Sequence, residues 1–251
     1  MSEVALVIPA RLGSTRLPRK ALADIEGAPM VVRTAQSASA LRGVSRIIVA
    51  TDSEEIFGHV QRAGFEARIT PTELASGTER VAFVARDLSE KIIINVQGDE
   101  PLIEPLAIEA ALDPVRQRGR RMGSAYTHFR SYDELLKPSH VKVLVNDEGD
   151  AIYFSRFALP YRQGEVSEAE ILNDPAIGRH LGIYVYEREF LLEFAQAKSP
   201  VIERAESLEQ LRVLQRGVKL GMGRTAFDAV SVDTQEDLER AREIYRQRNR
   251  S

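Results

Sequence analysis

The chain has 251 residues, 43% apolar and 28% charged, which is enough to bury the core of one large α/β domain. Its 34 basic and 37 acidic residues give a formal net charge of −3, which argues against a general affinity for DNA or RNA. The absence of cysteine excludes disulfides, thiolate zinc sites and cysteine nucleophiles. No apolar run approaches about eighteen residues and no signal pattern opens the chain, so we expect a cytoplasmic protein without a membrane partner.

The first half of the chain alternates strand and helix signals at the spacing of βα units. Apolar runs predict strands at 4–9, 46–51, 65–69 and 91–96. Proline or serine caps predict helices at 29–42, from about 52 onward, and at 76–86. The run 91–96 is apolar throughout, which is typical of a strand buried on both faces. This order predicts an α/β fold with a doubly wound, mostly parallel sheet.

The second half is more mixed. We expect one domain over 1–251, with a smaller mixed α/β lobe inserted at about 125–190. A hairpin is predicted over 141–155 and a strand over 182–186, followed by helices at 187–197, 203–216 and 235–248. The polar segment 161–179 is expected to be a mobile surface loop.

A basic loop follows the first strand. Arg11, Arg16, Arg19 and Lys20 lie within ten residues, around the flexible segment 13–15. In an α/β protein this loop leaves the carboxyl end of the first strand, where ligands bind. Although isolated cations usually just lie in water, clustered cations and backbone amides are suited to a polyphosphate. We therefore interpret the loop as an anion site.

An acidic turn, Gln97-Gly98-Asp99-Glu100-Pro101, follows the strand at 91–96. A carboxylate at the carboxyl end of a strand, beside a glycine, is well placed to hold a divalent cation. The motif alone is weak, because similar turns cap helices in many proteins. Combined with the basic loop it indicates nucleotidyl transfer, in which cations hold a triphosphate and a metal offsets developing charge.

Eight stretches resemble the 3-deoxy-manno-octulosonate (Kdo) cytidylyltransferase family, in the family's order along the whole chain. They are 8–20, 49–52, 76–80, 95–101, 153–156, 180–184, 208–212 and 232–234. The resemblance implies a fold like that of nucleotide-diphospho-sugar transferases, with the mixed lobe serving dimerisation and sugar binding. It also implies transfer of CMP from CTP to the anomeric hydroxyl of Kdo for lipopolysaccharide synthesis, Mg²⁺ as the cofactor, and a homodimer.

The resemblance also implies roles for individual residues. The triphosphate and catalytic residues are Arg11, Lys20 and Asp99, and the metal ligands are Asp99 and Asp233. The cytosine and ribose pocket is implied to be lined by Pro9, Ala10, Ser76, Gly77, Thr78 and Arg80. The sugar acid is implied to contact Gln97, Arg156, His180, Tyr184, Glu209 and Gln210.

Several of these residues also have a purely structural interpretation. Ser76 and Asp233 fit helix N-caps, His180 fits a satisfied structural histidine, and Tyr184 fits a core residue. Arg156 is easier to assign to the substrate, because a guanidinium pairs bidentately with a carboxylate.

The chain departs from the family pattern at three places. Arg19 stands where the family usually has glycine, Glu73-Leu74-Ala75 replaces a common Asp-His-Gln stretch, and Tyr161 replaces tryptophan. These departures leave open an altered substrate, for instance 8-amino-Kdo. A sialic acid cytidylyltransferase and a non-catalytic nucleotide sensor are two further hypotheses for the function. The stretch 221–226 matches a dinucleotide-binding pattern, which we reject because no helix signal follows it.

Overall fold

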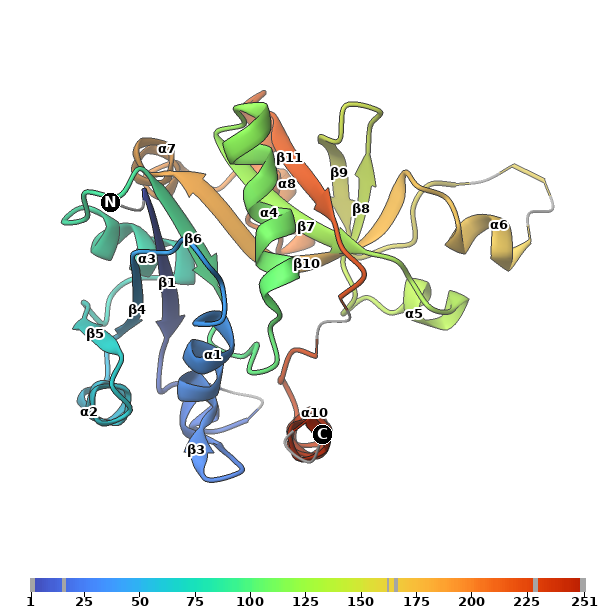
Figure 1. The fold of residues 1–251 in the computed structure, drawn as a ribbon. Coiled ribbons are helices and arrows are strands. Elements are labelled where there is room, and N and C mark those ends of the chain that lie inside the picture. Colours follow the sequence, from blue (N-terminus) through green and yellow to red (C-terminus); the bar gives the residue numbers. More distant parts are fainter. Residues whose placement is uncertain (1–2, 15–16, 162, 165–166, 228–229, 249–251) are drawn as a thin grey trace.

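The computed structural model describes residues 3–14, 17–161, 163–164, 167–227 and 230–248. In this part of the chain, nine strands form one sheet whose main path runs β11-β7-β10-β6-β1-β4-β5, with β8 and β9 off this path (Figure 1). Their bounds are β1 Val4–Ala10, β4 Arg46–Thr51, β5 Glu66–Ile69, β6 Ile92–Val96, β7 Met122–Thr127, β8 Lys142–Val145, β9 Ala151–Ser155, β10 Ile177–Glu187 and β11 Leu220–Arg224. A separate two-stranded sheet contains β2 Asp24–Ile25 and β3 Ala28–Pro29.

Most neighbouring strands on the main path are parallel. β1 pairs in parallel with β4 and β6, β4 with β5, and β11 with β7. β10 runs antiparallel between β6 and β7, so four of the six pairings are parallel. The prediction of a doubly wound, mostly parallel sheet is confirmed.

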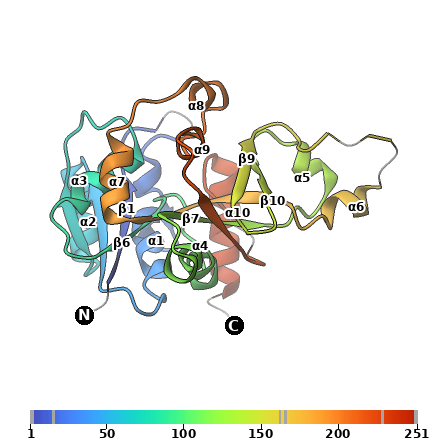
Figure 2. The ribbon, with the colours of Figure 1, turned by 90° about the horizontal axis from the view of Figure 1, so that it is seen from above.

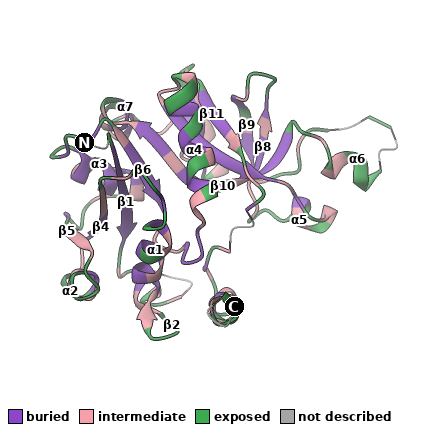
Figure 3. Cartoon of the chain, viewed as in Figure 1, coloured by how far each residue is buried: buried purple, intermediate pink, exposed green. Residues whose placement is uncertain are grey.

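Helices cover both faces of the sheet, as the doubly wound pattern requires (Figure 2). One face packs against α1 Met30–Ala38, α2 Glu54–Arg62 and α4 Pro105–Arg118. The other packs against α3 Gly77–Ala85, α7 Arg188–Ala195 and α9 Leu211–Gln215. The remaining helices are η1 Lys20–Leu22, α5 Tyr132–Leu136, α6 Glu168–Leu172, α8 Val201–Glu206 and α10 Gln235–Arg248. Burial concentrates on the central strands, whereas α6 has no buried residue and α5 has only Leu135 (Figure 3).

Several boundaries differ from the sequence prediction. The helix predicted at 29–42 ends at Ala38. The helix predicted at 203–216 is divided into α8 and α9, because Ser207 takes a left-handed conformation with φ of 53° that ends α8. The segment 161–179 contains α6, which begins with a Ser167–Glu170 capping box.

Several elements were not predicted, among them α4, β7 and β11. α4 contains Pro114, which normally argues against a helix, and β7 has the small and polar sequence Met-Gly-Ser-Ala-Tyr-Thr although it is fully buried. The third, β11, includes the glycines of the rejected dinucleotide-binding pattern. A Cβ atom at Gly223 would lie 1.7 Å from the Ala110 carbonyl oxygen, so this glycine lets β11 approach α4. The pattern therefore serves packing.

The parallel strands bring their carboxyl ends to one edge of the sheet. The basic loop follows β1, the acidic turn follows β6, and the segment after β11 returns to the same edge before α10. β8, β9, α5 and α6 lie to one side of this edge (Figure 1). The division into one domain with an inserted lobe stays a prediction. None of the helices in the described ranges has the length and hydropathy needed to span a bilayer.

Candidate active site

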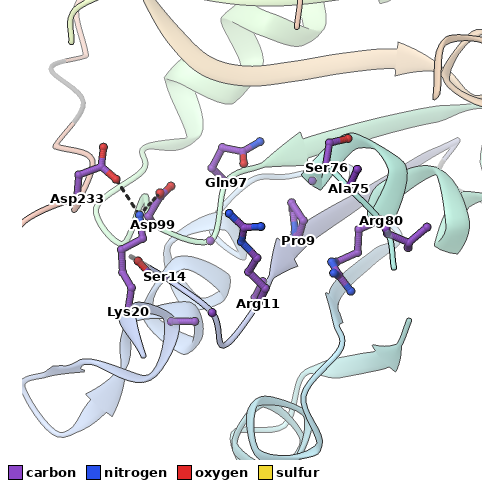
Figure 4. A pocket seen from close by; sticks show the side chains of 16 residues that line it. Pro9, Arg11, Ser14, Lys20, Ala75, Ser76, Arg80, Gln97, Asp99 and Asp233 are labelled. Carbon is purple, nitrogen blue, oxygen red and sulfur yellow. Dashed lines mark hydrogen bonds and ion pairs between the residues drawn. The ribbon is translucent and has the colours of Figure 1, made fainter. Parts of the chain in front are cut away.

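A cavity of about 340 Å³ lies at the carboxyl edge of β1 and β6. Its size falls within the range of small-molecule sites. It is lined by Pro9, Ala10, Arg11, Gly13, Ser14, Lys20, Ala21, Leu74, Ala75, Ser76, Gly77, Arg80, Gln97, Gly98, Asp99 and Asp233 (Figure 4). Ten of these residues were predicted site residues. The fold thus gathers the predicted triphosphate, metal and most nucleoside residues, together with Gln97, into one hollow.

Lys20 lies between the two predicted metal ligands. Its Nζ atom is 2.6 Å from Asp99 Oδ2 and 2.9 Å from Asp233 Oδ1 (Figure 4). Burial works against the charge of the ammonium, but the charges of Asp99 and Asp233 and their hydrogen bonds outweigh burial and raise the pKa of Lys20. Lys20 is therefore a fixed cation at neutral pH, and the two carboxylates can share one cation.

The acidic turn is held by α1 and by β1. Thr34 Oγ1 donates to the Gly98 carbonyl at 3.1 Å, and Ser37 Oγ donates to the Pro101 carbonyl at 2.7 Å. A Cβ atom at Gly98 would lie 2.9 Å from the Pro9 carbonyl oxygen, so only glycine allows this approach. These contacts fix the turn on both sides of Asp99, whose side chain lines the cavity.

Asp233 reaches the cavity from the segment that precedes α10. Its backbone N–H donates to Asp237 Oδ2 at 3.1 Å, and Thr234 Oγ1 accepts from the Asp237 N–H at 3.2 Å. Thr234 therefore takes the capping role that the sequence offered to Asp233. The Asp233 carboxylate is left to face Lys20.

The predicted nucleoside side of the cavity is built on the start of α3. Ser76 caps this helix by accepting from the Glu79 N–H at 3.1 Å, as predicted. Arg80 lines the same wall, with its side chain only 4% exposed and 2.8 Å from Asp52 Oδ2. It also donates to Thr70 Oγ1. Asp52 was not a predicted site residue, although its position directly after β4 is a general sign of one.

Glu209 connects the α3 wall to the segment between α8 and α9. It accepts hydrogen bonds from Thr78 Oγ1 and, at 3.4 Å, from Ser76 Oγ. Burial raises the pKa of Glu209, although the Thr78 hydrogen bond and the charge of Arg212 oppose this shift. Thr78 and Glu209 thus lie behind the cavity wall and brace it.

Other predicted sugar residues gather on the neighbouring sheet face. Tyr184 is the register partner of Asn95, and its hydroxyl donates to Gln210 Oε1 at 3.3 Å. Gln97 Nε2 donates to Asn95 Oδ1 at 3.1 Å. The amide nitrogens of Asn95 and Gln210 are buried and have no hydrogen-bond partner among the described residues. Buried donors of this kind are costly, so they indicate a surface prepared for a polar ligand.

His180 belongs to the same group of side chains. Its ring centroid is 5.5 Å from that of Tyr184, and its Nε2 atom is 2.8 Å from Ser124 Oγ. Ser124 Oγ donates in turn to the Ile183 carbonyl at 2.7 Å. Burial lowers the pKa of His180 to about 3, so the ring is neutral at pH 7.

Arg156 does not line the cavity. Its Nε donates to the Glu206 carbonyl at 2.8 Å, and its other nitrogens donate to the carbonyls of Pro138 and Ser207. The side chain therefore caps the end of α8. Arg11 differs, since it is exposed in the cavity and makes no ion pair with any residue that the structure describes. Arg16 lies outside the described residues.

The departures from the family pattern lie at separate places. Arg19 takes a left-handed conformation with φ of 58°, which suits the glycine that the family resemblance implies at this position, and it pairs with Glu55. Leu74 and Ala75 line the cavity, so the departure at Glu73-Leu74-Ala75 changes the predicted nucleoside wall. Tyr161 is 91% exposed and does not line the cavity.

Glu100 is a buried carboxyl that the sequence prediction did not assign. Burial, together with the charge of Asp99, raises the pKa of Glu100 to about 8. Its Oε1 atom accepts a hydrogen bond from Ser231 Oγ. No sequence signal pairs these two residues, because 131 positions separate them.

Known cytidylyltransferases are similar to this chain over most of its length. Residues 5–220 match the family model described as cytidylyltransferase. The chain is 41% identical over 253 residues to 3-deoxy-manno-octulosonate cytidylyltransferase of Trichlorobacter lovleyi, covering 98% of this chain and 99% of that protein. The chain belongs to this family. The corresponding protein of Neisseria gonorrhoeae is 42% identical over 252 residues, with the same coverage.

Solved structures of similar proteins lead to the same family. The structure of CMP:2-keto-3-deoxy-manno-octonic acid synthetase complexed with CTP has a TM-score of 0.89 at 37% identity, covering 98% of this chain and 99% of that one. HddC from Yersinia pseudotuberculosis has a TM-score of 0.68 at 14% identity, covering 96% and 99%, and shares the fold. The family resemblance read from the eight sequence stretches is confirmed.

Proposed function

We propose that this chain transfers CMP from CTP to the anomeric hydroxyl of Kdo and releases pyrophosphate. The observation that carries the proposal is the meeting of Lys20, Asp99 and Asp233 from three distant segments, in the cavity that Arg11 and the start of α3 also line. This set provides cations for a triphosphate and carboxylates for a metal. The similarity to a synthetase structure complexed with CTP supports the choice of nucleotide.

The residues fit a Mg²⁺ ion. The carboxylates of Asp99 and Asp233 already share the ammonium of Lys20, with oxygen atoms 2.6 and 2.9 Å from Nζ. Mg²⁺ is commonly held by one or two carboxylates together with substrate phosphates and water, so Asp99 and Asp233 would hold it here. When bound, it would polarise the α-phosphate as a Lewis acid.

The chain's own residues then supply position and charge. Arg11 and Lys20 hold the triphosphate and offset negative charge on the departing pyrophosphate. The anomeric oxygen attacks the α-phosphorus in line, its O–P bond forms as the bond to the pyrophosphate oxygen breaks, and the hydroxyl proton passes to solvent water. The start of α3, with Ser76 and Gly77, holds the nucleoside beside Pro9 and orients the α-phosphate.

Neutral polar groups recognise the sugar in this proposal. Gln97, Tyr184 and Gln210 offer amide and hydroxyl groups to its hydroxyls, and His180 acts as a neutral hydrogen-bonding ring because its pKa is about 3. Arg156 would reach the sugar's carboxylate only by releasing the carbonyls that it now caps.

We propose that the enzyme works as a homodimer in the cytoplasm, within lipopolysaccharide synthesis. The dimer surface is assigned to the mixed second half, where Ile152, Phe157 and Tyr161 are 57%, 80% and 91% exposed. Exposed large apolar side chains that lie close together in the sequence favour a protein–protein contact.

The deciding experiment measures pyrophosphate release from CTP and Mg²⁺ with Kdo, 8-amino-Kdo and sialic acid offered separately. We expect release with Kdo and none after chelation of the metal. A preference for the amino sugar would keep the chemistry and change the substrate. Release with none of the sugars, while CTP still binds, would contradict the proposal and favour a nucleotide sensor.

A further inference from the structure

The segment that carries Asp233 forms no helix or strand over the described residues 230–234. It lies between β11, which ends at Arg224, and α10, which begins at Gln235. Its place beside Asp99 therefore depends on a few contacts that reach across the fold. Two carboxylates that face one cation also repel each other, so these contacts must hold Asp233 against that repulsion.

Two adjacent hydrogen bonds join this segment to the acidic turn. The Val232 N–H donates to the Asp99 carbonyl at 2.9 Å, and Ser231 Oγ donates to Glu100 Oε1. Val232 is fully buried in a small apolar cluster with Leu102 and Leu238. The backbone from 231 to 232 thus lies alongside the backbone from 99 to 100, one residue before Asp233.

Glu100 is an unfavourable residue at this buried position. It is 4% exposed, and its Oε2 atom has no hydrogen-bond partner within the described residues. A buried polar atom without a partner destabilises the folded chain.

We infer that Glu100 is a positioning residue, which through Ser231 holds Asp233 at the distance from Asp99 that one divalent cation requires. The inference rests on the proposed function, because it assumes that these two aspartates hold the metal. Partners that orient metal ligands are commonly worth about 10–100-fold in metal affinity.

The chain contains a matched control pair. Ser45 Oγ donates to Glu90 Oε1 at 2.8 Å, Glu90 is 7% exposed, and its Oε2 atom also has no partner among the described residues. This pair precedes β4 and β6, at the opposite edge of the sheet from the cavity. It reproduces the chemistry of Glu100 and Ser231 without the metal site.

The experiment measures Mn²⁺ binding in the presence of CTP, from the spectrum of free Mn²⁺, and the unfolding temperature of each variant. Glu100→Met and Ser231→Ala should weaken Mn²⁺ binding about 10-fold. The unfolding temperature of Glu100→Met should be at or above that of the wild type. The unfolding temperature of Ser231→Ala should lie within a few degrees of it. Glu100→Gln keeps an acceptor for Ser231 and should bind Mn²⁺ within about twofold of the wild type. Glu90→Met and Ser45→Ala should leave Mn²⁺ binding unchanged.

Two results would overturn the inference in different ways. If Glu100→Met and Ser231→Ala bind Mn²⁺ as the wild type does, while Asp233→Asn binds it more weakly, the metal site stands and the positioning role is wrong. If Asp233→Asn binds Mn²⁺ as tightly as the wild type, the proposed metal site is wrong and the inference falls with it. Because Ser231→Ala removes only one hydroxyl from an exposed residue, it keeps the test decisive even if Glu100→Met folds poorly.

Discussion

At the scale of single residues, the two cations that line the cavity differ in their ion-pair partners. Lys20 is clamped by two carboxylates, whereas Arg11, in the same basic loop, has no ion-pair partner in the described part of the chain. Arg11 can therefore meet a phosphate directly, while Lys20 must leave or share its carboxylates. Lys20 is thus ion-paired before a ligand binds, whereas Arg11 is not paired with any described residue.

Asp99→Asn should lower turnover about 1000-fold while CTP binding changes by no more than about threefold. Losing a metal ligand removes several kcal/mol of transition-state stabilisation, whereas most contacts to the nucleotide come from other residues. Turnover is measured by pyrophosphate release and binding by calorimetry. Asp113→Asn, at an exposed position of α4, is the matched control. Near-normal turnover in Asp99→Asn would contradict the metal assignment.

Lys20→Met should strengthen the binding of Mn²⁺ without nucleotide, by about tenfold or 1.4 kcal/mol. The ammonium lies where both carboxylates converge, so it opposes a second cation there. Turnover should fall in the same variant, because the triphosphate loses a cation. Calorimetry without CTP gives the affinity, and unchanged or weaker Mn²⁺ binding would show that Lys20 does not compete for the site.

His180 should make stability depend on pH on the acid side. Burial lowers the pKa of His180 to about 3 in the folded chain, against about 6.5 when unfolded. As the pH falls below about 6.5 the unfolded chain takes up a proton that the folded chain refuses, so stability is lost down to about pH 3. His180→Gln should flatten this decline in unfolding temperature between pH 7 and pH 4. Equal slopes in both proteins would contradict the prediction.

At the scale of elements, small residues decide how closely neighbours approach. β11 packs its glycines onto α4, where Cβ atoms at Gly221 and Gly223 would lie 2.4 Å from Pro114 Cβ and 1.7 Å from the Ala110 carbonyl oxygen. The same elements were missed from the sequence, because glycine and proline normally interrupt strands and helices. Packing between the elements overrides that local preference.

Gly223→Ala should destabilise the fold by about 1–3 kcal/mol or more, because the added methyl meets backbone that cannot move aside. The control is Gly58→Ala within α2, where the nearest atom to the new Cβ is the end of the Arg62 side chain at 3.8 Å. That change should stabilise by about 0.5–1 kcal/mol. Urea unfolding measures both, and equal effects would contradict the packing argument.

At the scale of the whole molecule, one sheet edge collects residues that lie far apart in sequence. Lys20 and Asp233 are 213 positions apart, and Ser76 and Glu209 are 133 apart. Parallel strands make this possible because each strand ends at the same edge. β8, β9, α5 and α6 lie to one side of this edge (Figure 1).

Phe157→Glu should convert the proposed homodimer to a monomer at micromolar concentration. Phe157 is 80% exposed, and a glutamate in its place would be buried as an unpaired charge in the dimer. Light scattering coupled to size exclusion measures the mass. Leu106→Glu, at a 67% exposed position at the start of α4, is the control and should leave the mass unchanged. A monomeric wild type would contradict the dimer itself.

Much of the first half could be predicted from sequence because its signals are local. Apolar runs gave β1, β4 and β6, and the Ser53 and Ser76 caps marked α2 and α3. In the second half the signals were weaker. Nothing local separates α8 from α9 at Ser207, whose left-handed conformation is imposed by the surrounding fold.

The sequence by itself determined the family, the doubly wound sheet and the cavity residues with strong motifs, such as Arg11, Lys20 and Asp99. The family follows from the resemblance of eight stretches, whereas the sheet, the basic loop and the acidic turn follow from runs and spacings a few residues long. Only the tertiary structure decided that Lys20 bridges Asp99 and Asp233, that Arg156 caps α8, and that Glu100 meets Ser231. Such contacts join residues tens to hundreds of positions apart, and they exist only once burial of the sheet has brought those segments together.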